Sequence, residues 1–317
     1  MKKFSIIIPS FNQGKFIERC IRSILSEKKN VEIIIIDGES SDNTVDIIQA
    51  YSKEIAYWES VPDKGQSHAI NKGLEKCTGE IINWIACDDF LEKGSLRKIE
   101  KAFENDIDVY CGLARIIEND IVTCHKISSK YTYSWSFTLA FGQNMQPATF
   151  WKQQVFLEMA PVREDLHYIM DGYMWLKYIL KYGYSRICFD NKNIVVNVDM
   201  QIDAKSVKHI DKFYNEWLTI FSWIKDSCDN ANKASKNSAC FEINQHLVCN
   251  EINKINFYLL VDRMFKTGLS KKKRLRFDVL VEIIKKNPLW LIKYYLFEKS
   301  NMKKLRGIPS NIDSKGF

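Results

Sequence analysis

The sequence predicts an α/β fold, a three-layer α/β/α sandwich around a mostly parallel central sheet, followed by a helical C-terminal extension. Three observations support this fold class. Short apolar runs alternate with segments of helical periodicity in the first half, the connections between them are short, and the pattern turns helical after about residue 205. We place a boundary near residue 203, which gives an α/β domain over residues 1–203 and a helical, basic extension over residues 204–317.

The first strands and helices follow from these two patterns. Continuous runs of β-branched aliphatic residues are typical of strands buried on both faces of a parallel sheet. Apolar residues at helical spacing lie between the runs, and Asp42 and Asn43 offer an N-cap to one such segment. We therefore expect strands at residues 5–9, 32–37 and 81–87, and helices at residues 16–25, 44–51 and 69–74. This βαβα order favours a right-handed, doubly wound sheet.

The later elements are less regular. We expect, in order, a helix at residues 95–103, strands at 108–117 and 121–123, a helix at 171–182, and strands at 185–189 and 194–198. Gly183 ends the second of these helices. Aromatic residues crowd the interval 131–151, where they line a pocket or form a satellite core.

The composition is that of a folded globular protein. Hydrophobic residues make up 46% of the 317 residues and charged residues 27%. No apolar run approaches the roughly 18 residues of a membrane span, and the first residues show no secretion signal. Nine scattered cysteines without a C-x-x-C pair argue against a zinc site and a disulfide framework. We therefore expect a cytoplasmic protein with reduced thiols.

The formal net charge of +7 favours an anionic partner, which could be nucleic acid, an anionic lipid surface or a phosphorylated small molecule. Basic residues concentrate in the C-terminal part, as in Lys271–Arg274 and Lys303–Arg306. This stretch could lie on the inner face of the cytoplasmic membrane, or form a helical cap with a solvated basic face. We expect no nucleic acid, because aromatics and lysines are not interleaved along one exposed strand motif.

Asp88 and Asp89 directly follow the third apolar run, where a buried strand meets solvent. Adjacent carboxylates repel each other, and hard cations such as Mg2+ bind carboxylate oxygen. Ligands of open α/β sheets collect outside the carboxyl ends of the strands. The pair is therefore a candidate metal site, and a solvated loop is the plain alternative.

Two other segments place polar side chains near strand ends. Asp37 ends the second run, where a carboxylate can accept hydrogen bonds from a nucleoside, although the following residues fit a helix-capping turn equally well. Residues 62–73 combine a charged turn with a helix start, whose N–H groups could bind phosphate with help from Lys64 or Lys72. The alternative is an ordinary turn and short helix.

Four motifs occur in a fixed order: S-I-I-I-P-S-F-N-Q, I-I-D-G-E-S-S-D-N-T, D-K-G-Q-S-x-A-I-N-K-G and C-D-D-F-L. Together they resemble the family 2 glycosyltransferases with the GT-A fold. A fifth segment, D-G-Y-M-W-L at residues 171–176, looks like the family's aspartate-aromatic-Trp-Leu segment. The resemblance covers roughly residues 4–185 and implies that residues 1–203 are a GT-A catalytic domain.

The resemblance implies an inverting transferase that moves a sugar from a nucleotide-diphosphate donor, UDP-linked as the best guess. The acceptor would be a hydroxyl of a saccharide or lipid-linked glycan in surface polysaccharide synthesis. A divalent cation, Mn2+ or Mg2+, would bridge the diphosphate and neutralise its charge. A noncatalytic nucleotide-sugar or glycan-binding protein of the same fold is the alternative function.

The resemblance also assigns roles to residues. Asp89 would be the direct metal ligand, and Asp88 a ribose or metal contact. Asp171 would be the general base that removes the proton of the acceptor hydroxyl, although it could instead be the N-cap of its helix. The other donor contacts that the resemblance implies are Pro9, Phe11, Asp37, Asp63, Lys64, Gln66 and Asn71.

Three features depart from the family pattern. His68 and Cys87 stand where similar sequences often carry other residues, which puts the choice of donor in doubt more than the activity. Residues 198–206 only faintly resemble a family segment that contains Arg and His. Since neither residue is present there, a diphosphate clamp from this loop would fall to Lys205.

Overall fold

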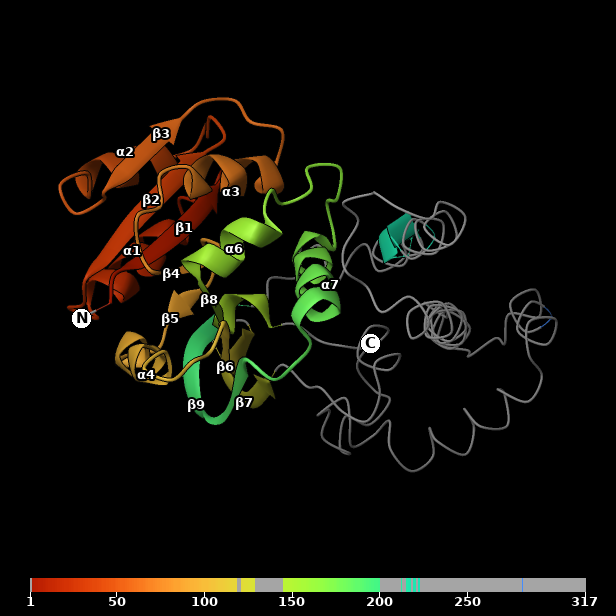
Figure 1. The fold of residues 1–317 in the computed structure, drawn as a ribbon. Helices are drawn as coiled ribbons and strands as arrows, with labels where there is room; N and C mark the ends of the chain where they lie inside the picture. Colours follow the sequence, from red (N-terminus) through yellow and green to blue (C-terminus); the bar gives the residue numbers. More distant parts are fainter. Residues whose placement is uncertain are drawn as a thin grey trace. The chain divides into compact units, whose positions relative to one another are not determined.

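The computed structural model describes residues 2–118, 121–128 and 145–199, and a few positions between 212 and 281. These residues form a nine-stranded sheet with flanking helices (Figure 1). The strands are β1 (Phe4–Ser10), β2 (Val31–Asp37), β3 (Tyr57–Ser60), β4 (Ile81–Trp84), β5 (Phe90–Leu91), β6 (Val109–Glu118), β7 (Ile121–Ser128), β8 (Thr149–Lys152) and β9 (Ile187–Asp199). The helices are α1 (Ile17–Leu25), α2 (Thr44–Ala50), α3 (Gln66–Leu74), α4 (Ser95–Ala102), the 3-10 helix η1 (Gln146–Ala148), α6 (Gln153–Met159) and α7 (Met170–Tyr182).

The sheet has a parallel half and a mixed half. Its order is β3-β2-β1-β4-β8-β6-β9-β5, and β7 pairs with β6. β3, β2, β1 and β4 run parallel, so their carboxyl ends lie at one edge. In the other half β6 and β9 are parallel, whereas β8, β7 and β5 pair with their neighbours antiparallel. The predicted α/β class is confirmed, with the parallel strands gathered mainly in the first half of the chain.

Helices cover both faces of the parallel half because its strands send alternate isoleucines to opposite sides. Ile6 belongs to a buried cluster that includes the apolar sides of α1 and α2. Ile34 packs with Ala69 of α3 in a separate cluster. Gly73 permits the close approach of α3 to β1, since a Cβ there would lie 2.6 Å from Cγ2 of Ile7. The predicted three layers follow from this alternation.

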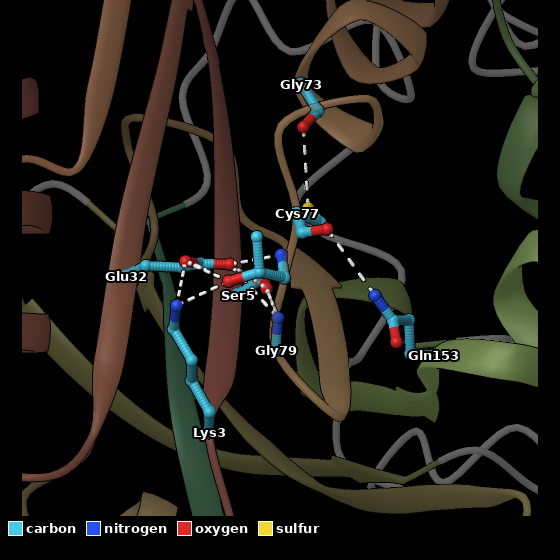
Figure 2. A network of polar contacts seen from close by, with 8 residues as sticks. Lys3, Ser5, Glu32, Gly73, Cys77, Gly79 and Gln153 are labelled. Atoms are coloured by element: carbon cyan, nitrogen blue, oxygen red, sulfur yellow. Dashed lines mark hydrogen bonds and ion pairs between the residues drawn. The ribbon is translucent and has the colours of Figure 1, made fainter.

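The buried carboxylate of Glu32 connects the amino ends of the parallel strands through hydrogen bonds (Figure 2). Glu32 of β2 is 7% exposed and forms an ion pair with Lys3. Its Oε1 accepts hydrogen bonds from Oγ of Ser5 at 2.6 Å and from the N–H of Gly79 at 3.1 Å, and the N–H and hydroxyl of Thr78 donate to the same carboxylate. Glu32 thereby connects β1, β2 and the segment that leads into β4. These contacts lie at the amino ends of the strands, opposite to the carboxyl ends where Asp37, Asp88 and Asp89 lie.

The structure differs from the sequence predictions in several elements. The third predicted strand ends at Trp84, three residues early. The two strands predicted at 185–189 and 194–198 are parts of the single strand β9, in which Asp190 accepts hydrogen bonds from the N–H groups of Lys192 and Asn193 and makes a local irregularity. The short strands β3, β5 and β8 and the helix α6 were not predicted, because runs of two to seven residues carry little periodic signal.

The chain divides into two compact units, one formed by Met1–Ser129 with Gln143–Ile210 and the other by Lys130–Gly142 with Asp211–Phe317. All the predicted site residues belong to the first unit. The boundary near residue 203 stays a prediction, and the basic C-terminal stretches, Lys205 and most of the aromatic interval lie outside the described residues. In the part of the chain that the structure describes, no helix is long and apolar enough to cross a membrane.

Candidate active site

The carboxyl ends of β1, β2 and β4 bring three predicted segments to one edge of the sheet. Ser10 and Asp37 are partners in the parallel register of β1 and β2. After β4 ends, the N–H of Ile85 donates to the carbonyl of Ile7 at 2.9 Å, which keeps the chain alongside the second half of β1. Sγ of Cys87 then lies 3.5 Å from the carbonyl oxygen of Pro9. The loop that holds the acidic pair therefore passes beside the first motif.

Asp88 and Asp89 occupy a tight turn, in which the N–H of Asp89 donates to the carbonyl of Ala86 at 3.0 Å. Asp89 is 4% exposed and Asp88 is half-buried. Burial raises the pKa of Asp88, and the charge of Asp199 adds to the shift. Burial and then the charge of Asp88 raise the pKa of Asp89 well above its ordinary value. The pair is a concentration of negative charge that a cation would stabilise.

The donor set of the pair fits a hard divalent cation whose other ligands come from a substrate. Its two carboxylates offer oxygen, which Mg2+ and Mn2+ prefer. Within the described residues, no group of three or more His, Cys, Asp and Glu side chains is arranged to hold a metal. Mg2+ commonly binds through one or two carboxylates together with substrate phosphates, so two protein ligands suffice for such a site.

Two residues that the sequence did not single out complete this cluster. The N–H of Asp199, at the end of β9, donates to Oδ1 of Asp89 at 3.3 Å. Nη2 of Arg19, on α1, donates to Oδ2 of Asp199 at 2.6 Å and to the carbonyl of Asp88 at 2.9 Å. An acid at the end of a predicted strand was a signal for Asp199. Arg19 gave none, because it lies among ordinary polar residues of an amphipathic helix.

Asp37 is completely buried, and its carboxylate already has partners. Oδ2 accepts hydrogen bonds from the N–H of Ser40 at 2.8 Å and the hydroxyl of Ser60 at 2.7 Å, and Oδ1 accepts from the hydroxyl of Ser40 at 2.6 Å. Asp37 thus fixes the turn after β2, whereas Asn43, the N-cap residue of α2, makes no side-chain cap. Phe11, by contrast, is 59% exposed at the end of β1, and Pro9 is half-buried. Contact of these residues with a nucleoside stays a prediction.

The turn before α3 lies against the turn after β2. A Cβ on Gly38 would lie 2.9 Å from Oδ2 of Asp63, so these two motifs are in direct contact. Oδ1 of Asp63 also accepts the N–H of Gly65, whose φ of 107° suits glycine. Lys64 is exposed, and Gln66 is the half-buried first residue of α3. Their contact with a diphosphate stays a prediction; Lys72, the other basic residue of this segment, forms an ion pair with Glu59.

Asn71 connects α3 to the loop that leads to Asp171. Its Oδ1 accepts the N–H of Val162 at 2.8 Å, and its Nδ2 donates to the carbonyl of Val162 at 2.8 Å and to Glu164 at 3.2 Å. The hydroxyl of Ser67, one turn earlier, donates to the carbonyl of Leu166. The predicted donor contact of Asn71 is untested. The structure gives the residue a definite role in holding this loop.

Asp171 lies in the first turn of α7 and makes no side-chain cap of that helix, whose N-cap position is Ile169. Burial raises the pKa of Asp171 to about 6, although the N–H of Gly172 works in the opposite direction. One turn further on, Trp175 packs edge-to-face on Trp151 with ring centroids 5.5 Å apart. This aromatic packing holds the turn that follows Asp171, and a carboxylate with a pKa of about 6 is mostly ionised at neutral pH. The role of Asp171 as the general base stays a prediction.

Comparisons with known proteins bear on the family and the fold of the chain. The family model Glycosyl transferase family 2 matches residues 5–175. An uncharacterized glycosyltransferase of Rickettsia typhi is 24% identical over 226 residues, which are 67% of this chain and 70% of that protein. The GalNAc(5)-diNAcBac-PP-undecaprenol beta-1,3-glucosyltransferase of Campylobacter jejuni is 34% identical over 116 residues, which are 35% of this chain and 38% of that protein.

Among solved structures, S. aureus TarS 1-349 in complex with UDP-GlcNAc has a similar fold. The TM-score is 0.58 at 15% identity, and the alignment covers 90% of this chain and 81% of that chain. The family match spans more than half of the chain. The protein therefore belongs to glycosyl transferase family 2 and is a glycosyltransferase with the GT-A fold.

Proposed function

We propose that the protein is an inverting, metal-assisted glycosyltransferase that moves a sugar from a UDP-linked donor to a hydroxyl of a saccharide or lipid-linked acceptor. The observation that carries the proposal is the acidic pair. Asp89 is buried and Asp88 half-buried at the edge where the parallel strands end, in the part of the chain that the family match covers. Buried adjacent carboxylates cost stability, and such a cost is typical of a functional site.

The relatives support the choice of donor and acceptor. TarS, which shares the fold, was crystallised with UDP-GlcNAc. The relative from Campylobacter jejuni is named as a glucosyltransferase acting on GalNAc(5)-diNAcBac-PP-undecaprenol. The exposed ring of Phe11, at the end of β1, offers a stacking surface for a nucleobase. We infer a role in the synthesis of a surface glycan, at the inner face of the cytoplasmic membrane.

The residues of the chain divide the chemistry between them. Asp88 and Asp89 would hold a divalent cation, which neutralises charge on the leaving diphosphate when bound. Asp171 would take the proton of the acceptor hydroxyl as its oxygen attacks the anomeric carbon. The new bond to oxygen forms while the bond from the anomeric carbon to the diphosphate breaks on the opposite side. This geometry inverts the anomeric centre.

A panel of nucleotide sugars tests the proposal. UDP-, GDP- and ADP-linked sugars are incubated with the protein in the presence of Mn2+, Mg2+ or EDTA, and the free nucleoside diphosphate is measured. We expect the protein to hydrolyse at least one UDP sugar, and we expect EDTA to abolish this hydrolysis. Asp89→Asn should lose this activity, and Asp165→Asn should keep it, because Asp165 is exposed and pairs only with Arg163 among the ion pairs of the described residues.

The possible outcomes separate the alternatives. Hydrolysis of GDP or ADP sugars alone would contradict the UDP assignment. Activity that is unchanged by EDTA would contradict the proposed dependence on a divalent cation. Binding of a nucleotide sugar without hydrolysis, and without transfer to any saccharide acceptor, would favour the noncatalytic binding protein.

A further inference from the structure

Arg19 joins three segments of the chain at the acidic pair. Its Nη2 donates to the main-chain carbonyl of Asp88, at 2.9 Å, and to the carboxylate of Asp199, at 2.6 Å. Its guanidinium also lies over the ring of Phe90, 4.5 Å from the centroid. One side chain of α1 thus contacts the residues on both sides of Asp89 and the end of β9.

The strand register explains why Asp199 reaches the acidic pair. β5 and β9 are antiparallel, with Phe90 opposite Asn197. Counting two residues outward along each strand places Asp88 opposite Asp199. The N–H of Asp199 donates to Oδ1 of Asp89, and only 4% of the Asp199 side chain is exposed. A buried third carboxylate therefore lies beside the first two, although 110 residues separate Asp199 from Asp89 in the sequence.

The ion pair with Arg19 offsets part of the negative charge that Asp199 brings to the acidic pair. Without it, three neighbouring carboxylates would repel one another in a site of low exposure. The guanidinium suits this position because it donates in several directions within one plane and stacks on an aromatic ring, which a lysine ammonium cannot reproduce. Arg19 fixes the backbone of Asp88 and, through Asp199, the carboxylate of Asp89.

We propose that Arg19 is a positioning residue, anchored by Asp199, which holds Asp88 and Asp89 in the geometry that receives the divalent cation. The proposal rests on the metal-assisted function proposed above. Hydrogen-bonding partners of metal ligands typically contribute about 10- to 100-fold in metal affinity. The same loss is expected when Arg19 or Asp199 is replaced.

Direct titration with Mn2+ tests this role without relying on turnover. The electron paramagnetic resonance signal of free Mn2+ is followed as the full chain is added, with and without UDP. Arg19→Ala and Asp199→Asn should each bind Mn2+ about 10- to 100-fold more weakly than the wild type, and Arg19→Lys should restore part of the affinity. Arg22→Ala is the matched control. Arg22 lies on α1 and lines the same surface cavity as Arg19, but its ion pair is with Glu18 and not with Asp199.

A purely structural role would lower the melting temperature and leave Mn2+ affinity intact in the folded protein. Wild-type affinity in Arg19→Ala, or an equal loss in Arg22→Ala, would overturn the proposal. If Arg19→Ala does not fold, wild-type Mn2+ affinity in Asp199→Asn would overturn the proposal. A wild-type protein that binds no Mn2+ would overturn it as well. If Mn2+ affinity falls as expected but no nucleotide sugar is turned over, the proposed reaction fails while the role of Arg19 stands.

Discussion

At the scale of single residues, the proposed base depends on burial rather than on a charged neighbour. Asp171 lies in the first turn of α7, and the next turn of this helix packs on Trp151 through Trp175. Removing water from a carboxylate disfavours its ionised form, which raises the pKa of Asp171 to about 6. A carboxylate with this pKa remains mostly ionised at neutral pH and accepts a proton more readily than an exposed aspartate does.

The pH dependence of transfer follows from this pKa. kcat/KM should be constant above about pH 7 and fall about tenfold per pH unit below about pH 6, because only the ionised Asp171 accepts a proton. Asp171→Asn should abolish transfer and leave donor affinity, measured by calorimetry, near the wild-type value. Asp165→Asn should preserve both the activity and the profile. Substantial transfer by Asp171→Asn would show that another group is the base.

Some site residues could be predicted from the sequence because their position depends on local features. Asp88 and Asp89 follow an apolar run, and the end of such a run in an α/β pattern marks the edge where ligands bind. Arg19 could not be placed in this way, and the predicted strand end before Asp199 did not show that Asp199 meets the acidic pair. Their contact depends on the antiparallel pairing of the two-residue strand β5 with β9, which no local pattern encodes.

At the scale of elements, polar groups connect neighbouring strands of the parallel half at both the carboxyl and the amino ends of the strands. The strand-end edge carries the candidate site, and the opposite edge carries Glu32 with its partners from β1 and from the segment before β4 (Figure 2). Burial alone would raise the pKa of Glu32, but hydrogen bonds from Lys3, Ser5 and Thr78 outweigh it and lower that pKa. Glu32 therefore stabilises the fold in its ionised form.

Glu32→Gln should lower the free energy of unfolding by about 1–3 kcal/mol at neutral pH, because an amide loses the ion pair and turns one acceptor into a donor. The difference between the two proteins should shrink in acid. A depressed pKa gives stability that is present above the ordinary carboxyl pKa and is lost as pH falls through the folded value. Urea unfolding of both proteins at several pH values measures this difference.

Glu80→Gln is the control for this measurement. Glu80 pairs with Lys2 near the same edge, but its side chain is 58% exposed. Its replacement should change the free energy of unfolding by less than about 0.5 kcal/mol. Equal effects of the two substitutions would contradict a special role for the buried carboxylate.

The strands whose bounds the sequence predicted best are buried along almost their whole length. β1 and β2 are continuous aliphatic runs because helices cover both faces of the sheet there, and the structure places them within two residues of the prediction. β3 and β8 have four residues each and depend on partners far away in the sequence. Their pairing energy comes from long-range contacts, so a window of local sequence carries little information on them.

At the scale of the whole molecule, the charge is distributed unevenly. The strand-end edge of the sheet gathers Asp88, Asp89 and Asp199, whereas the excess of basic residues that gives the chain its net charge of +7 lies toward the C-terminus. A diphosphate-containing substrate would need a cation to bind at the acidic strand ends. The basic C-terminal region is suited to an anionic surface, and we infer that this region brings the enzyme to a membrane that carries its acceptor.

Liposome co-sedimentation tests that inference. Removing residues 270–317 should strongly reduce binding to vesicles rich in anionic lipid, because each Lys or Arg near such a surface contributes about 1 kcal/mol. Replacing the four consecutive basic residues Lys271–Arg274 with Gln keeps the chain length and should reduce binding in part. Neutral vesicles should bind less in every case, and binding of the wild type should weaken at high salt. Co-sedimentation that is the same with and without residues 270–317, or the same on anionic and neutral vesicles, would show that the basic C-terminal region does not attach the enzyme to a membrane.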